Sequence, residues 1–239
     1  MDPDRGKLDL ETEALAERYA RRNTDWATQA YSPLNLSVCL SSQERERALV
    51  RMLTRRARPT EAMTVLEIGC GMGGNLAELI KLGFLPEKLT GLDLLTNRIE
   101  AARRRLPSSV QLIEGDALTA SLPKASYDIV YTSTVFSSIL DDSFQLMLAE
   151  RMWSLLKPGG FILWYDFIYN NPWNQDVRGV KLRRVTELFP RGTLRCHKLT
   201  LAPQISRVVT RIHPRLYGLL NALPILRTHV LCEIEKAEA

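Results

Sequence analysis

A glycine-rich stretch in the first third of the chain has the residue types to hold a ligand against bare main chain. Gly69, Gly71 and Gly74 follow the short apolar run 64–68 and precede a helical pattern. Glycines at a strand-to-helix turn let a ligand approach the backbone closely, because no Cβ intervenes, and the following helix presents free N–H groups. Glu67 adds a carboxylate beside the turn. The stretch therefore predicts a site for a nucleotide-like ligand.

Two further acids follow the next two apolar runs. Asp93 lies 24 residues after Gly69, where a carboxylate can accept hydrogen bonds from two ribose hydroxyls. Asp116 follows the third run and is placed to accept a hydrogen bond from an adenine amino group. The glycines and Asp93 suit NAD and S-adenosylmethionine equally. Glu67 favours the second, because a sulfonium and an ammonium group tolerate a negative charge that a pyrophosphate would meet unfavourably.

Short apolar runs alternate with helical patterns from residue 63 onward. Strands are expected at 64–68, 88–92, 110–113, 128–131, 161–165, 194–201 and 229–234. Helices are expected at 10–22, 42–56, 75–82, 97–106, 142–156 and 182–189, the second opened by a capping box at Ser41 and Glu44 and the fourth capped by Thr96. This alternation predicts an α/β, doubly wound, Rossmann-like fold with seven mostly parallel strands. The last strand follows a helical insertion and is expected to be antiparallel.

Length and composition predict one structural domain. The chain has 239 residues, of which 45% are apolar and 25% are charged, as in ordinary globular proteins. Residues 1–60 are expected to form an N-terminal helical lid or extension, and residues 61–239 the Rossmann-like domain. No apolar run approaches the roughly 18 residues that a membrane span needs.

The four cysteines lie far apart in the sequence and form no CxxC pair. They therefore predict neither a disulfide framework nor a structural zinc site, and no metal site is expected. A reducing, cytoplasmic location is the default expectation for such a chain.

Taken together, these motifs resemble the class I S-adenosylmethionine-dependent methyltransferases over roughly residues 63–165. The resemblance rests on the Glu67 to Gly74 turn, Asp93, the Gly115-Asp116-Ala117 segment and the turn 156–160. It implies S-adenosylmethionine as cofactor, with Glu67, Gly69 and Gly71 at its methionine part. Asp93 would hold the ribose, and Asp116 and Ala117 the adenine. The other residues that the resemblance implies at the cofactor are Cys70, Asn75, Leu94, Arg98, Gly115 and Thr132.

The general base is harder to assign. Many members of the family carry a histidine after the fourth strand, where this chain has Ser138. Asp166, at the end of the fifth strand, is our first candidate for a base or an acceptor-orienting group, because an ionisable residue ending an apolar strand is costly unless used or paired. Its alternative is a structural hydrogen bond to nearby backbone. His213, beside Pro214, is the histidine most open to substrate.

The acceptor is expected to be a small molecule or a glycan, methylated at oxygen. The segment after the fifth strand is polar and aromatic, which suits hydroxylated rings or sugars. It is faintly similar to methyltransferases of natural-product or glycan biosynthesis. The residues expected at the acceptor are Tyr31, Ser137, Ser138, Tyr169, Asn170 and Trp173.

Three alternatives stay open at this point. The chain after residue 150 carries 14 basic and 6 acidic side chains, which would suit methylation of RNA. A nucleic-acid partner is disfavoured because no RNA-binding motif is present. A non-catalytic cofactor-binding protein would explain the missing histidine, and an NAD-dependent oxidoreductase would use the same glycines. A homodimer is also considered.

Overall fold

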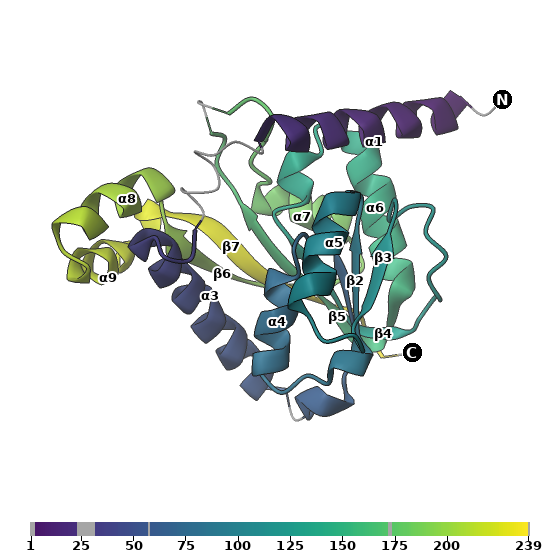
Figure 1. Cartoon of the computed structure of the whole chain (residues 1–239), viewed down its shortest axis with the longest axis horizontal. Helices are drawn as coiled ribbons and strands as arrows, with labels where there is room; N and C mark the ends of the chain where they lie inside the picture. Colours follow the sequence, from purple (N-terminus) through teal and green to yellow (C-terminus); the bar gives the residue numbers. More distant parts are fainter. Residues whose placement is uncertain (1–2, 23–31, 57, 172–173, 239) are drawn as a thin grey trace.

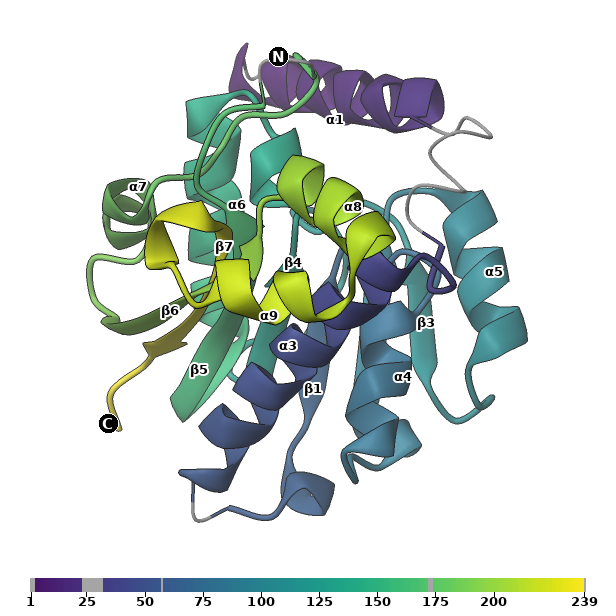
Figure 2. The same ribbon diagram turned by 90° about the vertical axis from the view of Figure 1, so that its left-hand side faces the viewer.

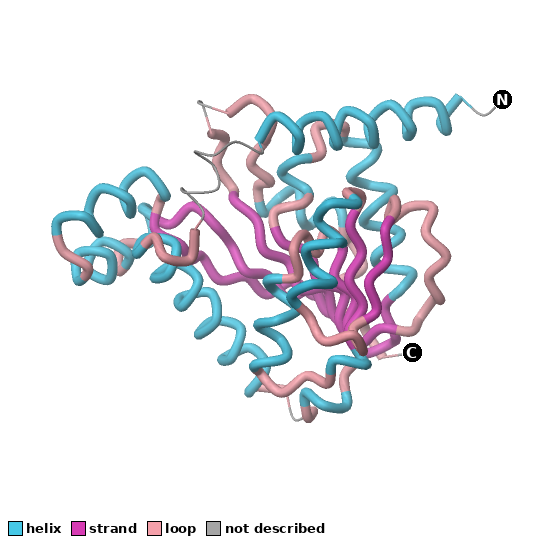
Figure 3. Tube along the Cα trace, viewed as in Figure 1, coloured by secondary structure: helices cyan, strands magenta, loops and turns pink. Residues whose placement is uncertain are grey.

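The structure is a computed structural model that describes residues 3–22, 32–56, 58–171 and 174–238. The strands of these residues form one sheet in the order β3-β2-β1-β4-β5-β7-β6. Figures 1 and 3 show this sheet at the centre of the molecule with helices packed around it. The doubly wound α/β fold that the sequence predicts is therefore confirmed.

Only β7 runs against its neighbours among the strands of this sheet as described. It is antiparallel to both β5 and β6, so β6 runs in the same direction as β5, and the other neighbouring strands are parallel. The strands are β1 (Val65–Ile68), β2 (Leu89–Asp93), β3 (Gln111–Glu114), β4 (Tyr127–Ser133), β5 (Leu156–Phe167), β6 (Thr193–Leu201) and β7 (Arg227–Glu235). β1 and β2 are buried along their whole length, as continuous apolar runs in a parallel sheet require.

Helices cover both faces of the sheet. The apolar side chains of α3, α4 and α5 form one core with one face, and those of α6 and α7 form a second core with the other. Figure 2 shows α3, α4 and α5 on the near side and α1 across the top of the molecule. The helices are α1 (Pro3–Arg22), α3 (Leu36–Thr54), α4 (Gly74–Lys81), α5 (Thr96–Arg105), α6 (Asp142–Leu155), α7 (Leu182–Leu188), α8 (Pro203–Ile212) and α9 (Arg215–Asn221), with the short turns η1 (Thr60–Ala62), η2 (Pro86–Lys88), η3 (Phe136–Ser138) and η4 (Pro224–Leu226).

Some predicted helix starts are right and others are wrong. The helix expected from residue 142 does begin there, and Asp141 caps it, because the Asp141 side chain accepts a hydrogen bond from the backbone N–H of Phe144. The helix expected from residue 42 begins at Leu36, capped by Asn35, because Asn35 Oδ1 accepts from the backbone N–H of Ser37. Thr96 does not cap α5; its hydroxyl bonds to Glu114 instead. The expected turn 156–160 is the start of β5.

One disulfide corrects the expectation drawn from the cysteines. Cys196 and Cys232 are bonded to each other, 36 residues apart in the sequence. They are direct partners in the antiparallel pairing of β6 with β7, and only that pairing brings them together. Cysteine spacing could not reveal it, because α8, α9 and η4 separate the two strands. Cys39 and Cys70 are free.

In the described part of the chain, no helix has the length and apolar composition needed to cross a membrane.

Candidate cofactor and acceptor site

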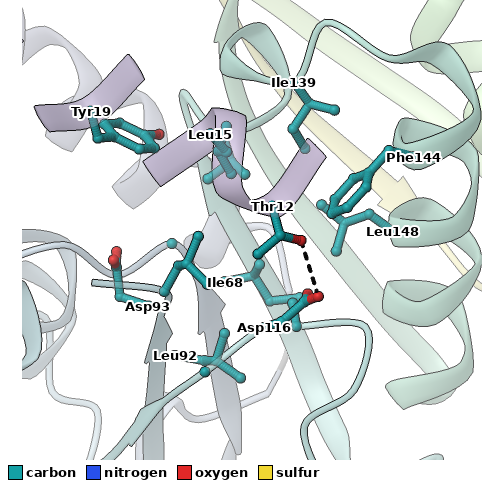
Figure 4. Close-up of a pocket in the computed structure, with 15 residues that line it drawn as sticks. Thr12, Leu15, Tyr19, Ile68, Leu92, Asp93, Asp116, Ile139, Phe144 and Leu148 are labelled. Carbon is teal, nitrogen blue, oxygen red and sulfur yellow. Dashed lines mark hydrogen bonds between the residues drawn. The ribbon is translucent and has the colours of Figure 1, made fainter. Parts of the chain in front are cut away.

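A pocket lies at the carboxyl edge of the sheet, beneath α1 (Figure 4). It encloses about 520 Å³ of space, a figure that includes open solvent at its mouth. Its walls come from the segments that follow β1 to β4, from α6 and from α1. The residues that line it are Thr12, Leu15, Tyr19, Ile68, Gly69, Leu92, Asp93, Leu94, Gly115, Asp116, Ala117, Val135, Ile139, Phe144 and Leu148.

The glycine turn after β1 brings main chain to this pocket. Gly69 has φ +72°, and a Cβ at that position would lie 2.4 Å from Val135 Cγ2. The backbone N–H groups of Gly69 and Cys70 both donate to the carbonyl of Leu92, which ties the turn to the end of β2. Residue 69 must therefore be glycine, both for its positive φ and for its close approach to Val135 in the loop after β4.

Asp93 joins the glycine turn to the pocket. Its Oδ2 accepts from the backbone N–H of Gly71 at 2.8 Å, and its Oδ1 accepts from that of Leu95 at 3.0 Å. The side chain lines the pocket while these two bonds fix its orientation. An ionised carboxylate has about four lone-pair positions, so Asp93 keeps acceptor capacity for a ligand.

Asp116 lies on the neighbouring strand connection and faces the same pocket (Figure 4). Its Oδ1 accepts from the backbone N–H of Leu118 at 2.9 Å, and its Oδ2 accepts from the hydroxyl of Thr12 at a long 3.4 Å. Gly115 and Ala117 flank it and add little side-chain volume to the pocket wall. The two carboxylates expected at ribose and adenine therefore do line one cavity.

Glu67 lies behind the glycine turn and does not line the pocket. Its side chain is 0% exposed, and its Oε1 accepts from Asn75 Nδ2 at 2.6 Å. Burial raises the pKa of Glu67 to about 8, against the lowering effects of the Asn75 hydrogen bond and of Arg45. Its Oε2 is buried without a hydrogen-bond partner among the described residues. Asn75, which the resemblance also implies at the cofactor, is thus engaged with Glu67.

The remaining predicted cofactor residues divide between the pocket and the core. Leu94 lines the pocket, and Arg98 lies above the ring of Tyr19, with its guanidinium carbon 4.2 Å from the ring centroid. Cys70 and Thr132 are buried outside the pocket lining. Burial raises the pKa of the Cys70 thiol, so it is a poor nucleophile.

Asp166 is turned away from the pocket. Its carboxylate is 1% exposed and accepts two backbone N–H groups, that of Ser137 at 3.0 Å and that of Phe167 at 2.9 Å. Burial raises the pKa of Asp166 to about 7, although both hydrogen bonds lower it. The structural hydrogen bonds named as the alternative for this residue are therefore present, and they hold η3 against β5.

α1 is anchored over η3 by a group of polar contacts. Arg18 is buried and donates through Nη1 both to Glu11, at 2.8 Å, and to the carbonyl of Ser138, at 3.1 Å. Glu11 accepts from the backbone N–H of Leu140, and the Tyr19 hydroxyl donates to Ser138 Oγ at 3.3 Å. Ser137 and Ser138, expected at the acceptor, are thus buried beneath α1 beside the pocket.

The other predicted acceptor and catalytic residues are dispersed. Tyr169 is half-exposed, and Asn170 Oδ1 accepts from the backbone N–H of Gly179, in the connection that follows β5. His213 is exposed between α8 and α9, and neither it nor Asn170 lines the pocket. Tyr31 and Trp173 lie outside the described residues.

Sequence reasoning missed the contribution of α1 to the pocket wall. Thr12, Leu15 and Tyr19 come from this helix, and their spacing of three and four residues puts them on one helical face. That spacing is the signal that could have identified them, although Tyr31 alone was expected at the acceptor from this part of the chain. Phe144 and Leu148 of α6 form an apolar part of the same pocket wall.

Comparisons with known proteins agree with this geometry. Residues 65–160 match the methyltransferase domain family. A fatty-acid O-methyltransferase of Mycolicibacterium smegmatis is 30% identical over 171 residues, which cover 67% of this chain and 61% of that protein. A sterol 24-C-methyltransferase of Gibberella zeae is 29% identical over 123 residues, covering 48% of this chain and 30% of that protein.

The fold has solved counterparts as well. An S-adenosylmethionine-dependent methyltransferase from Mesorhizobium loti superposes with a TM-score of 0.58 at 16% identity, covering 80% of this chain and 96% of that one. The chain therefore has the fold of the class I S-adenosylmethionine-dependent methyltransferases. Within that fold, residues 65–160 are the segment that matches the methyltransferase domain family. The chain spans 61% and 30% of the lengths of the two relatives named above.

Proposed function

We propose that this chain transfers a methyl group from S-adenosylmethionine to an oxygen atom of a small-molecule acceptor. The observation that carries the proposal is the pocket in which Asp93 and Asp116, from adjacent strand ends, face the bare main chain of Gly69. The match of residues 65–160 to the methyltransferase domain family supports the same reaction.

The chain's own residues fit the adenosine part of the cofactor. The free acceptor capacity of Asp93 suits two ribose hydroxyls, since only one hydrogen bond to each of its oxygens is already made. The weak bond from Thr12 to Asp116 Oδ2 occupies the position that an adenine amino group would take. Leu94 and Ala117 supply an apolar wall for a purine ring.

At the methionine end of the cofactor, Glu67 is proposed to stabilise a bound cationic group through its negative charge, without lining the pocket. Its buried Oε2 has no hydrogen-bond partner among the described residues, and its side chain does not line the pocket. A cationic group bound at Gly69 and Gly71 would stabilise the ionised form of Glu67 and lower its pKa. Binding would then release a proton at neutral pH.

Bound S-adenosylmethionine supplies an electrophilic methyl group, so the chain must chiefly align the acceptor and exclude water. We assign the exclusion of water to α1, whose Leu15 and Tyr19 cover the pocket. In this view α1 is the working part of the predicted lid, residues 1–60, on the domain formed by residues 61–239. Arg18 holds it closed through Ser138.

The acceptor is proposed to lie between α1, η3 and the connection after β5. Ser138, Tyr169 and Asn170 are the candidate acceptor contacts. Asp166 is proposed to position η3, and proton abstraction by Asp166 or His213 stays a prediction. The fatty-acid O-methyltransferase supports an oxygen acceptor on a small molecule. A glycan acceptor, a homodimer and a cytoplasmic location also stay predictions.

The test is transfer of a labelled methyl group from S-adenosylmethionine to a panel of fatty acids, phenols and sugars. We expect methylation of at least one hydroxyl or carboxyl acceptor, and its loss in Asp93→Ala. Failure of the protein to bind S-adenosylhomocysteine would overturn the proposal, whatever the panel contained.

A further inference from the structure

The polarity of α8 is inverted relative to an ordinary surface helix. The residues that α8 buries are Ser206 and Thr210, whose hydroxyls bond to carbonyls of the preceding turn. Val208 and Ile212, four residues apart, point to solvent instead. A helix packed on a water-soluble protein normally buries its apolar stripe and exposes its polar one. Ile205 and Val209 are half-buried, so the part of the apolar stripe left uncovered by the described chain is formed by Val208 and Ile212.

α9 packs against α8, η4 packs against α9, and both carry further exposed apolar side chains. We call the α8–α9 surface the set Val208, Ile212, Leu219, Leu223 and Ile225, each between 51 and 81% exposed. Among the described residues only two other large apolar side chains, Leu34 and Met72, are more than half exposed. A cluster of this kind marks an interaction site, whereas single exposed apolar residues need no explanation.

The surroundings of this surface are positively charged. Between Glu187 and Glu233 the sequence contains seven Lys or Arg residues and no Asp or Glu. Arg211 and Arg215 lie between the two helices' apolar residues and are exposed. Two of the basic residues of the C-terminal part of the chain therefore lie on the same helix pair as the exposed apolar side chains.

The surface projects from the sheet edge at which the cofactor pocket lies. β6 runs parallel to β5, so α8 leaves β6 at the carboxyl edge of the sheet. Figure 1 shows α8 and α9 at one end of the molecule, and in Figure 2 no described element lies in front of them. α8 therefore begins at the sheet edge that carries the pocket.

We propose that the α8–α9 surface docks the protein on an anionic lipid bilayer. Exposed aliphatic side chains bordered by arginines suit the boundary between acyl chains and anionic headgroups, where apolar burial and electrostatic attraction add. RNA would engage the arginines but gives no role to Ile212, Leu219 and Ile225. An acceptor embedded in the bilayer could then reach the pocket without crossing water.

Co-sedimentation with vesicles tests this inference without cofactor or acceptor, so its result is independent of the proposed reaction. The probes are vesicles of phosphatidylcholine alone and of equal parts phosphatidylcholine and phosphatidylglycerol. We expect the protein to sediment with the mixed vesicles and to be released by salt, since screening weakens the arginine contribution.

Two double variants separate the apolar and the charged contributions. Val208→Asp with Ile212→Asp removes two inserted side chains and should lower partitioning by about tenfold or more. Arg211→Gln with Arg215→Gln should lower binding to the mixed vesicles by about tenfold or more, since each basic residue near an anionic surface contributes about fivefold. Leu146→Asp, on the exposed side of α6, is the matched control and should bind as the wild type does.

Each contrary result overturns the inference. Absence of vesicle binding by the folded wild-type protein would do so, as would equal losses in the Leu146→Asp control. A concentration-dependent dimer that Val208→Asp with Ile212→Asp dissociates, without vesicle binding, would assign the surface to a second copy of this chain. RNA binding that only the arginine variant weakens, again without vesicle binding, would assign it to nucleic acid.

Discussion

β2 and β5 each end in a buried aspartate, and the two ends have different surroundings. Asp93 and Asp166 both follow apolar strands at the carboxyl edge of the sheet, and each carboxylate accepts two backbone N–H groups. Asp93 also lines the pocket, whereas Asp166 is enclosed beneath η3. One strand end presents its acid to the pocket, and the acid of the other strand end fixes a loop.

The difference arises from the segments that cover the two strand ends. After β2 the chain turns into α5, and Asp93, although buried, lines the pocket. Near the end of β5, η3 folds over Asp166 and donates the backbone N–H of Ser137. The same residue at the same end of a parallel strand is therefore not evidence of the same role.

The largest expected effect comes from the acid that faces the pocket. Asp93→Ala should weaken S-adenosylhomocysteine binding between about tenfold and a hundredfold, because hydrogen bonds between a charged group and the ribose are lost. Calorimetric titration measures the affinity. Glu87→Ala, on η2, is the control and should bind normally; equal affinity of Asp93→Ala and wild type would remove Asp93 from the site.

The acid that faces the core should affect stability instead. Asp166→Asn replaces one acceptor oxygen by an NH₂ group that faces a backbone N–H, and should lower the free energy of unfolding by about 1–3 kcal/mol. Its S-adenosylhomocysteine affinity should stay within about twofold of the wild type. Urea unfolding and calorimetry read these two effects separately. Unchanged stability with lost methyl transfer would instead favour Asp166 as the general base.

The buried acids also predict how stability depends on pH. The folded pKa of Glu67 is about 8, above its ordinary value near 4.5, and that of Asp166 is about 7, above 3.8. Between about pH 4 and about pH 8 the folded state therefore binds more protons than the unfolded state does. The stability that this protonation contributes is fully present below about pH 4 and is lost as pH rises through 7 to 8.

Glu67→Gln tests that dependence, because glutamine keeps an oxygen for Asn75 and cannot ionise. Between about pH 6 and about pH 9 the free energy of unfolding of the wild type should fall by roughly 1–3 kcal/mol. That of the variant should fall by clearly less. Equal losses of unfolding free energy in the wild type and in Glu67→Gln would mean that Glu67 ionises normally in the folded state.

A smaller effect is expected from the anchor of α1. Arg18→Ala removes the side chain that joins Glu11 to the carbonyl of Ser138, so α1 should cover the pocket less of the time. We expect S-adenosylhomocysteine affinity to fall roughly three- to tenfold, as the loss of about 1 kcal/mol implies. Glu13→Ala, exposed on the same helix, should have no effect. Equal S-adenosylhomocysteine affinities of Arg18→Ala and Glu13→Ala would indicate that α1 is not a lid.

The sequence was sufficient for the sheet and for bringing Asp93 and Asp116 to one pocket. Alternating apolar runs and helices predict the parallel strands, and acids at strand ends predict Asp93 and Asp116, because strand direction alone brings them to one edge. The disulfide Cys196–Cys232 and the role of α1 depend on contacts between distant segments, which local patterns do not encode. The surroundings of Asp166 likewise depend on how η3 folds back.

A crystal structure with S-adenosylhomocysteine is the most direct test of this account. We predict the ribose hydroxyls on Asp93, the adenine amino group on Asp116 in place of Thr12, and the amino-acid end along Gly69 and Gly71. Density for the nucleoside at any other place on the sheet, or hydrogen bonds that involve neither aspartate, would contradict the account.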